Sequence, residues 1–197
     1  MNHCTVDPIG SPNTASGHSF DGSHGIVCLR AAMEVDRGFL HAVYASTRTA
    51  EFLSAGWGAD EVHTLLAGQF ATQDTYYHRH YPHGRFDVVQ LGETPVGRLY
   101  HDWSGSAARV IDIALLPAYR GAGIGTRLMR ALVAEAARRE MPMCLYVEFD
   151  NPVRALYRRL GFVAIGENGV YEQMRRAGEP FDEEPAVPLA GLEASAA

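Results

Sequence analysis

The sequence predicts a mixed α/β fold in which a largely antiparallel sheet is flanked by helices. The apolar segment 110–115 has the composition of a central strand, and it leads through Pro117 and a glycine-rich turn into an amphipathic helix. Two more apolar runs, 86–91 and 95–101, lie on either side of a short turn, as in a hairpin. A strand, a helix and another strand then follow one another, which predicts a single parallel crossover within the sheet.

The first half of the body contributes one strand and two helices. Residues 26–31 form an apolar strand, and residues 37–55 carry apolar side chains at helical spacing. The glycines on either side of Trp57 end that helix. A second helix begins near Asp60 and ends before Pro82, which cannot continue it.

The second half contributes the crossover helix and the last strands. The segment 123–139 places its apolar side chains on one helical face. Asn151 is suited to cap a further helix, with Pro152 in its first turn and Gly161 at its end. The remaining strands are expected at 144–149, around Val163 and at 170–174.

The 197 residues are enough for one domain with tails. Residues 1–24 are expected to form a disordered leader, residues 25–176 the domain, and residues 177–197 an acidic flexible tail. The net charge of −6 is concentrated in these tails, and the body has no basic stripe that would indicate nucleic acid. No apolar run approaches the roughly 20 residues of a membrane span, and no signal peptide is evident. We therefore expect a cytoplasmic protein that binds neither nucleic acid nor membranes.

The composition excludes whole classes of chemistry. Lysine is absent, and all 17 basic residues are arginine. A Walker-type phosphate loop and a Schiff-base enzyme both need a lysine, so neither is present. Cys4, Cys28 and Cys144 have neither zinc-ligand nor redox spacing. Cys28 and Cys144 lie in apolar strand-like runs, where we expect buried thiols.

The glycine-rich turn is the most informative motif. The start of a helix leaves backbone N–H groups without partners, and glycines place no side chains in front of them. Such a site is suited to a phosphate or pyrophosphate. The alternative is a plain strand-to-helix turn, whereas a dinucleotide-binding fold would need another glycine at Thr126. The motif is Arg120, Gly121, Ala122, Gly123, Ile124 and Gly125.

A second motif, residues 155–162, ends in Leu160, Gly161 and Phe162. With these two motifs and this order of elements, the chain resembles the GNAT superfamily of N-acetyltransferases over roughly residues 25–175. The first motif matches the family's cofactor signature, Arg/Gln-x-x-Gly-x-Gly/Ala. One departure is visible, because the family's asparagine lies seven residues before the tyrosine, whereas Asn151 lies six before Tyr157.

The resemblance implies a GNAT-like sheet with a splayed cleft at the central strands and acetyl-CoA as co-substrate. It places the main chain of Leu115 and Leu116 beside the pantetheine arm, and it places Asn151 and Tyr157 near the cofactor. The implied pyrophosphate site comprises Arg120, Gly121, Ala122, Gly123, Ile124, Gly125 and Thr126.

Tyr157 is the catalytic candidate that the resemblance implies, since a phenol at this position assists departure of the thiolate; the alternative is an aromatic that only packs the helix. Glu148 shares its strand parity with Tyr146, toward the expected cleft, and is a candidate general base or anchor for a cationic substrate. Plain solvent exposure of Glu148, with a water chain as base, is the alternative. Asp112 lies in an apolar strand and needs a partner, such as an arginine or a backbone cap, which favours a structural role.

The segment 76–83 combines tyrosines with three histidines. His78, His80 and His83 do not share a helix face, so no metal is expected. We expect the aromatic side chains to line the acceptor site, and His101 and Asp102 are further candidates to reach it.

These features together predict direct transfer of an acetyl group from acetyl-CoA to a primary amine of a small molecule or peptide, with no covalent enzyme intermediate. A protein N-terminus and an antibiotic are further acceptor classes. The alternative is a non-catalytic acyl-CoA-binding or regulatory module on the same fold. A homodimer is a further expectation, and the acidic tail is a candidate to dock a partner.

Overall fold

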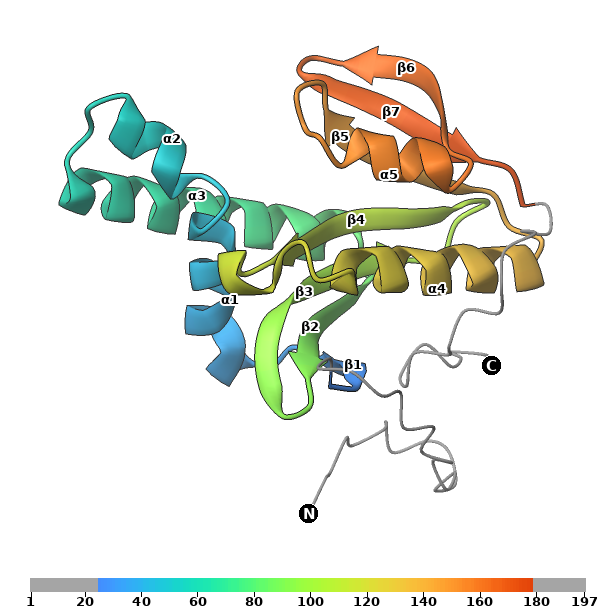
Figure 1. The fold of residues 1–197 in the computed structure, drawn as a ribbon, viewed down its shortest axis with the longest axis horizontal. Helices are drawn as coiled ribbons and strands as arrows, with labels where there is room; N and C mark the ends of the chain where they lie inside the picture. The colour runs from blue at the N-terminus through green and yellow to red at the C-terminus, as the bar shows by residue number, and fades with distance from the viewer. Residues whose placement is uncertain (1–24, 179–197) are drawn as a thin grey trace.

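The computed structural model describes residues 25–178 (Figure 1). The predicted leader and almost all of the predicted acidic tail, Cys4 included, lie outside these residues. No helix in the described part is long and apolar enough to cross a membrane. The elements are β1 Val27–Ala31, η1 Glu34–Asp36, α1 Arg37–Ala45, α2 Thr49–Ser54, α3 Ala59–His80, β2 Arg85–Leu91, β3 Thr94–Asp102, β4 Ala108–Leu115, η2 Pro117–Tyr119, α4 Ile124–Arg138, β5 Met143–Glu148, α5 Arg154–Arg159, β6 Val163–Asn168 and β7 Tyr171–Arg176.

The strands form one sheet in the order β1-β2-β3-β4-β5-β7-β6. Every neighbouring pair is antiparallel except β4 and β5, which are parallel and are connected by α4. The predicted fold class is therefore confirmed: a mixed α/β domain with a mostly antiparallel sheet and a single crossover.

Helices cover both faces of the sheet (Figure 1). Val89 packs with the apolar face of α4, whereas its neighbour Val88 packs with α1 and α3. Because successive side chains of a strand point to opposite faces, α4 lies on one face and the α1–α3 pair on the other. Helix α5 contributes Tyr157 and Leu160 to the same core as α4, so it shares the α4 face.

The sheet opens between its two central strands. Only Ala108 with Met143 and Arg109 with Cys144 pair β4 to β5, so the rest of β4 has no strand partner on that side. The register between β3 and β4 also shifts where Tyr100 pairs with Asp112 and His101 with Val110, which leaves Ile111 as an extra residue in β4. Such a bulge bends the strand that carries it. The predicted splay of the central strands is thus present, with β5, α5, β6 and β7 diverging from β4 (Figure 1).

The predicted helix at 37–55 is divided into α1 and α2. Around the break, the Ser46, Thr47 and Thr49 hydroxyls donate to the carbonyls of Val43, Tyr44 and Ala45 at 2.7–2.9 Å. Hydroxyl side chains that bond nearby carbonyls offer the backbone an alternative to a continuous helix. The apolar periodicity therefore locates both helices, and the cluster of hydroxyl residues accounts for the interruption.

The predicted buried thiols are confirmed, since Cys28 is 1% and Cys144 6% exposed and neither forms a disulfide. Both lie within strands of the sheet, β1 and β5.

Gly97 in β3 lies opposite Leu115, the last residue of β4. A Cβ at Gly97 would collide with the main-chain oxygen of Ala114 and would lie 2.6 Å from Leu115 Cδ2. We expect Gly97→Ala to lower the free energy of unfolding by about 1–3 kcal/mol in urea titrations, because backbone has to move. Gly68→Ala in α3, where a Cβ meets nothing within 4 Å, should instead raise it by up to about 1 kcal/mol. Equal effects of the two substitutions would contradict this account.

Candidate functional site

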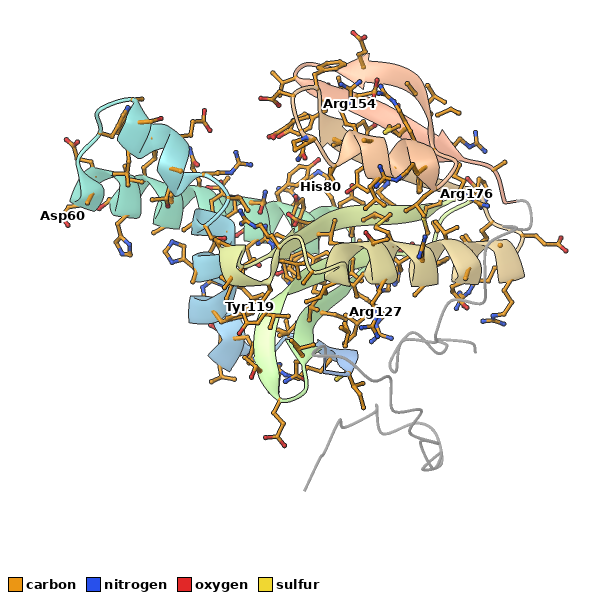
Figure 2. All side chains as sticks on the ribbon, viewed as in Figure 1. Asp60, His80, Tyr119, Arg127, Arg154 and Arg176 are labelled. Atoms are coloured by element: carbon orange, nitrogen blue, oxygen red, sulfur yellow. The ribbon has the colours of Figure 1, made fainter. Side chains whose placement is uncertain are left out.

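The glycine-rich turn between β4 and α4 has room for a ligand against its backbone. Gly121 and Gly123 have φ of 76° and 80°, in the left-handed region that favours glycine. At Gly121, Gly123 and Gly125 a Cβ would meet no atom within 4 Å, so the space beside all three is open. Tyr119 marks the turn in Figure 2.

The backbone of this turn presents a run of unused donors. The first bond of α4 is from the Arg127 N–H to the Gly123 carbonyl at 3.0 Å. Among the described residues, the N–H groups of residues 121–126 donate to no other group, and the first turn has no acidic side chain. The positive end of the helix dipole adds to these donors. The residues predicted to bind a pyrophosphate therefore present unused N–H donors beside open space, a cradle whose chemistry suits an anion.

Arg120 fastens the turn to the rest of the molecule. Its Nε donates to the Leu115 carbonyl at 2.8 Å, and its Nη2 donates to the carbonyl and hydroxyl oxygens of Ser46 at 3.3 and 3.0 Å. Arg120 therefore connects the end of β4, the glycine turn and the C-terminal end of α1. Its guanidinium supports the cradle from the protein side.

The unpaired edge of β4 offers main-chain groups next to this cradle. The Leu116 N–H donates to the Val96 carbonyl at 2.9 Å, so Leu116 is bonded to β3. Because bonding alternates along an antiparallel strand, Ile113 and Leu115 turn their N–H and C=O groups to the opposite, open edge. Of the two predicted main-chain contacts, Leu115 faces the opening while the Leu116 N–H is already used. Ile113 was missed, because only the register of the ladder identifies it.

Tyr157 of α5 lies on the α4 side of the opening and is 5% exposed. Its hydroxyl has no hydrogen-bond partner among residues 25–178. Burial raises the pKa of Tyr157 well above its ordinary range, and the nearby negative charge of Asp112 raises it further. The phenol therefore stays protonated at neutral pH and is able to donate a proton or a hydrogen bond.

Asp112 has the arginine partner that its apolar surroundings require. Arg98 donates to both carboxylate oxygens, with Nη2–Oδ2 at 2.8 Å and Nε–Oδ1 at 3.3 Å, and Tyr77 donates to Oδ2 at 3.3 Å. Arg98 also donates to the Gln73 side-chain oxygen at 3.0 Å and lies 5.2 Å from the ring centroid of Tyr100. The pKa of Tyr77 is raised by its burial and by Asp112, and burial raises the pKa of Tyr100 to about 12. The structural role expected for Asp112 is supported, and Arg98 is the partner that sequence reasoning did not identify.

Glu148 and Asn151 lie at the end of β5. Leu145 and Val147 enter the core beneath α4, so Glu148 and Tyr146 point to the other face, as their parity predicted. The Glu148 carboxylate has no ion pair or hydrogen bond within the described part of the chain. The Asn151 side-chain oxygen accepts from the Val153 N–H at 3.0 Å, which forms a turn just before α5 rather than a cap on its first residue.

The C-terminal end of α3, marked by His80 in Figure 2, brings aromatic side chains to the face that carries Asp112. Tyr77 bonds Asp112, and its ring lies 6.1 Å from that of Tyr76 and 6.4 Å from that of Tyr81. His78 stacks on Phe86 and His80 on Tyr76. Within the described residues no three His, Cys, Asp or Glu side chains are placed to hold a metal.

An open groove of about 680 Å³ runs along α3 and ends at Tyr76. The groove is lined by Thr64, Leu65, Gly68, Gln69, Thr72, Gln73 and Tyr76.

The expectation that His101 reaches the cleft is wrong. His101 is 2% exposed on the α4 face, where its Nδ1 accepts from the Trp103 indole N–H at 2.8 Å and its Nε2 lies 3.5 Å from Asp87. Asp102 points to the other face of β3, where it lies opposite Arg109 of β4, and its Oδ1 accepts from the Ser104 N–H at 2.8 Å; its place in the cleft stays a prediction. Because neighbouring residues of a strand point to opposite faces, His101 points away from the face that carries Tyr100 and the tyrosines at the end of α3.

Comparison with protein families identifies one match, to the acetyltransferase (GNAT) family, over residues 52–162. A comparison with curated proteins finds no match. Among solved structures, the chain is similar to PaiA N-acetyltransferase from Thermoplasma acidophilum in complex with coenzyme A (TM-score 0.58, 16% identity, 77% of this chain and 98% of that one). It is also similar to an acetyltransferase from Thermus thermophilus (TM-score 0.56, 19% identity, 79% and 99%). A third similar structure is RimL, a ribosomal L7/L12 α-N-protein acetyltransferase, in complex with coenzyme A (TM-score 0.52, 20% identity, 77% and 94%). At these identities the likeness establishes the shared fold.

The Arg98–Asp112 pair gives a stability test. We expect Asp112→Asn to lower the free energy of unfolding by about 3–5 kcal/mol, because it leaves the Arg98 guanidinium buried beside a neutral side chain. The double variant Arg98→Met, Asp112→Leu should recover most of that loss. Glu135→Gln, which removes a carboxylate shared by Arg138 and Arg139 at the helix surface, is the control and should cost about 1 kcal/mol. Urea unfolding followed by circular dichroism measures all three, and a similar cost for Asp112→Asn and Glu135→Gln would contradict the buried-pair account.

Proposed function

Because the chain belongs to the GNAT family of acetyltransferases, we propose that it transfers the acetyl group of acetyl-CoA to a primary amine of a small molecule or peptide. The observation that carries this proposal is the cradle of unused N–H donors at residues 121–126, adjacent to an unpaired strand edge. An anionic pyrophosphate suits the cradle, and an extended amide-containing arm suits the open edge of β4 as an added strand would.

The residues at the opening have distinct roles in the proposed reaction. Acetyl-CoA supplies the acetyl group as an activated thioester. Glu148, whose carboxylate has no partner among the described residues, accepts the proton that the acceptor ammonium must lose before its nitrogen attacks. As the new C–N bond forms and the C–S bond breaks, Tyr157 donates a proton to the departing sulfur, and the second proton of the attacking nitrogen then restores the phenol. The Arg98–Asp112–Tyr77 network supports this arrangement by holding the β4 side of the opening in one geometry.

The acceptor approaches from the α3 side. The groove along α3 ends at Tyr76, and Glu148, Tyr146 and Asp112 occupy the same face of the sheet. The cradle lies at the start of α4, and α4 covers the opposite face. The two substrates therefore meet at the opening from opposite sides of the sheet, which agrees with direct transfer without an enzyme-bound intermediate.

Titration calorimetry with acetyl-CoA tests the cofactor. We expect a micromolar Kd, on the order of −8 kcal/mol, for the unmodified protein. Gly125→Glu should weaken binding more than about a hundredfold, because it places a carboxylate in the open space of the cradle without a left-handed φ. Ala134→Glu, on the exposed side of α4, adds the same charge away from the cradle and should leave the Kd unchanged. Absence of binding by the folded protein, or equal Kd values for the two variants, would contradict the assignment of the cradle as the acetyl-CoA site.

Thiol release with a panel of primary amines tests catalysis. We expect Tyr157→Phe to lower kcat by about 10²-fold while the Kd for acetyl-CoA stays within about twofold. Because its pKa is raised above the ordinary value of about 10, Tyr157 should cause no loss of rate up to about pH 10, while deprotonation of the acceptor amine makes the rate rise. An unchanged kcat in Tyr157→Phe would exclude the proton donor. Binding without turnover of any amine would favour the alternative, a non-catalytic acyl-CoA-binding module.

A further inference from the structure

Arg109 lies at the root of the opening, on the face where the acceptor is proposed to approach. It pairs with Cys144 at the last point of contact between β4 and β5. Its guanidinium carbon lies 5.6 Å from the ring centroid of Tyr146, two residues further along β5. This places a cation on the floor of the α3 side of the opening.

Tyr146 lies beside this cation, Tyr81 is near enough to feel its charge, and Tyr76 lies near Tyr81. Tyr81 follows α3 directly and is followed by a short turn that contains Gly84. This turn lies against the bulge of β4, because a Cβ placed on Gly84 would be 3.4 Å from Ile111 Cδ1 and 3.0 Å from the Tyr81 carbonyl oxygen. The pKa of Tyr81 is raised by its burial and lowered by the charge of Arg109, and Tyr76 and Tyr146 are also near enough to affect it. We call Arg109, Tyr76, Tyr81 and Tyr146 the arginine–tyrosine cluster.

The cluster is rich in hydrogen-bond donors. Asp102 is the cross-strand neighbour of Arg109, but its carboxylate accepts from the Ser104 N–H and forms no ion pair with Arg109. A guanidinium carries five N–H donors and each phenol adds an O–H. Among residues 25–178, the Arg109 guanidinium has no carboxylate partner and no hydrogen-bond acceptor, and the three hydroxyls have no hydrogen-bond partner. Other arginines of the domain are ion-paired, as in Arg30–Asp36, Arg37–Asp74, Arg85–Asp87, Arg98–Asp112, Arg138–Glu135, Arg139–Glu135 and Arg154–Glu172.

The cluster is also accessible and close to the reacting groups. Tyr146 is 43% and Tyr76 50% exposed, and Arg109 is half-buried. Tyr77 connects the cluster to the reaction site, because its ring lies beside those of Tyr76 and Tyr81 while its hydroxyl bonds Asp112. A ligand bound here would therefore extend toward Asp112 and the opening.

We propose that the arginine–tyrosine cluster binds a carboxylate of the acceptor, so that the acceptor is an amine that also carries a carboxylate, such as an amino acid or a short peptide. A carboxylate presents two oxygens in a plane, which matches the fork of N–H groups on a guanidinium. The Arg109 guanidinium lies over the Tyr146 ring. The phenols supply the remaining hydrogen bonds. This assignment of the acceptor class rests on the proposed acetyltransferase activity.

Matched pairs of acceptors test the assignment. Each pair has the same amine and carries either a carboxylate or a carboxamide: phenylalanine and phenylalaninamide, glycine and glycinamide, 6-aminohexanoate and 6-aminohexanamide. O-phosphoethanolamine with ethanolamine tests whether a phosphate serves as well. We expect kcat/KM to favour the acid by about tenfold or more in at least one pair, since hydrogen bonds to charged groups are among the stronger ones.

Arg109→Gln should abolish that preference by raising KM for the acid, and it should leave kcat/KM for the amide within about twofold. Arg79→Gln, which removes an exposed arginine of α3 outside the cluster, is the charge-matched control and should preserve the preference. Tyr81→Phe should cause a smaller loss. A preference that survives Arg109→Gln, or equal turnover of acids and amides, would overturn the assignment while leaving the proposed activity intact. A larger gain from phosphate than from carboxylate would also overturn it.

A binding measurement decides the case in which no amine is turned over, an outcome that would overturn the proposed activity instead. Benzoate should raise the Tm of the unmodified protein and of Arg79→Gln, whereas benzamide should not, and Arg109→Gln should show no shift with either. Circular dichroism of each variant confirms that it is folded. No difference between benzoate and benzamide would overturn the carboxylate site.

Discussion

The site depends on one missing set of backbone hydrogen bonds. Two residue pairs join β4 to β5, and beyond Arg109 the edge of β4 has no strand beside it. Buried main-chain N–H and C=O groups are costly to leave unpaired. An edge in the middle of a sheet is therefore stable only where water or a ligand completes the bonding. The bulge at Ile111 bends β4 at this gap.

The groups around the gap are arranged by charges whose burial is unfavourable in itself. A buried ion pair such as Arg98–Asp112 seldom contributes more stability than apolar side chains of the same size would. We attribute its retention in the core to the orientation that it imposes. The pair holds the Asp112 carboxylate near Tyr157, and that carboxylate accepts from the Tyr77 hydroxyl. The stable packing is supplied elsewhere, by the apolar face of α4 against β3, β4 and β5.

Sequence patterns predict the elements that carry local signals. The strand, glycine turn and helix from Val110 to Arg139 and the hairpin around Gly92 follow the predicted order, because periodicity and turn chemistry act over a few residues. Three features carried no such signal. The first is the partner of Asp112, Arg98, which is 14 residues away on a neighbouring strand. The second is the open edge at Ile113, which is set by the register between β3 and β4. The third is the burial of His101, which is set by the face that β3 turns toward α4. The break between α1 and α2 did have a signal, in the hydroxyl residues Ser46, Thr47 and Thr49, but the apolar periodicity favoured one continuous helix. The roles assigned to Tyr157, Glu148 and Asn151 stay predictions.

Arg120 gives the molecule a mechanical connection between its two sides. One guanidinium holds the Leu115 carbonyl beside the glycine turn and the Ser46 oxygens at the break between α1 and α2. A ligand that shifts the turn must alter the free energy of that break, and a ligand that shifts the break must alter the turn. Thermodynamic linkage then requires that each ligand change the affinity of the other by the same factor. A ligand at the glycine turn and a group bound at the break between α1 and α2 would thereby be coupled through one side chain.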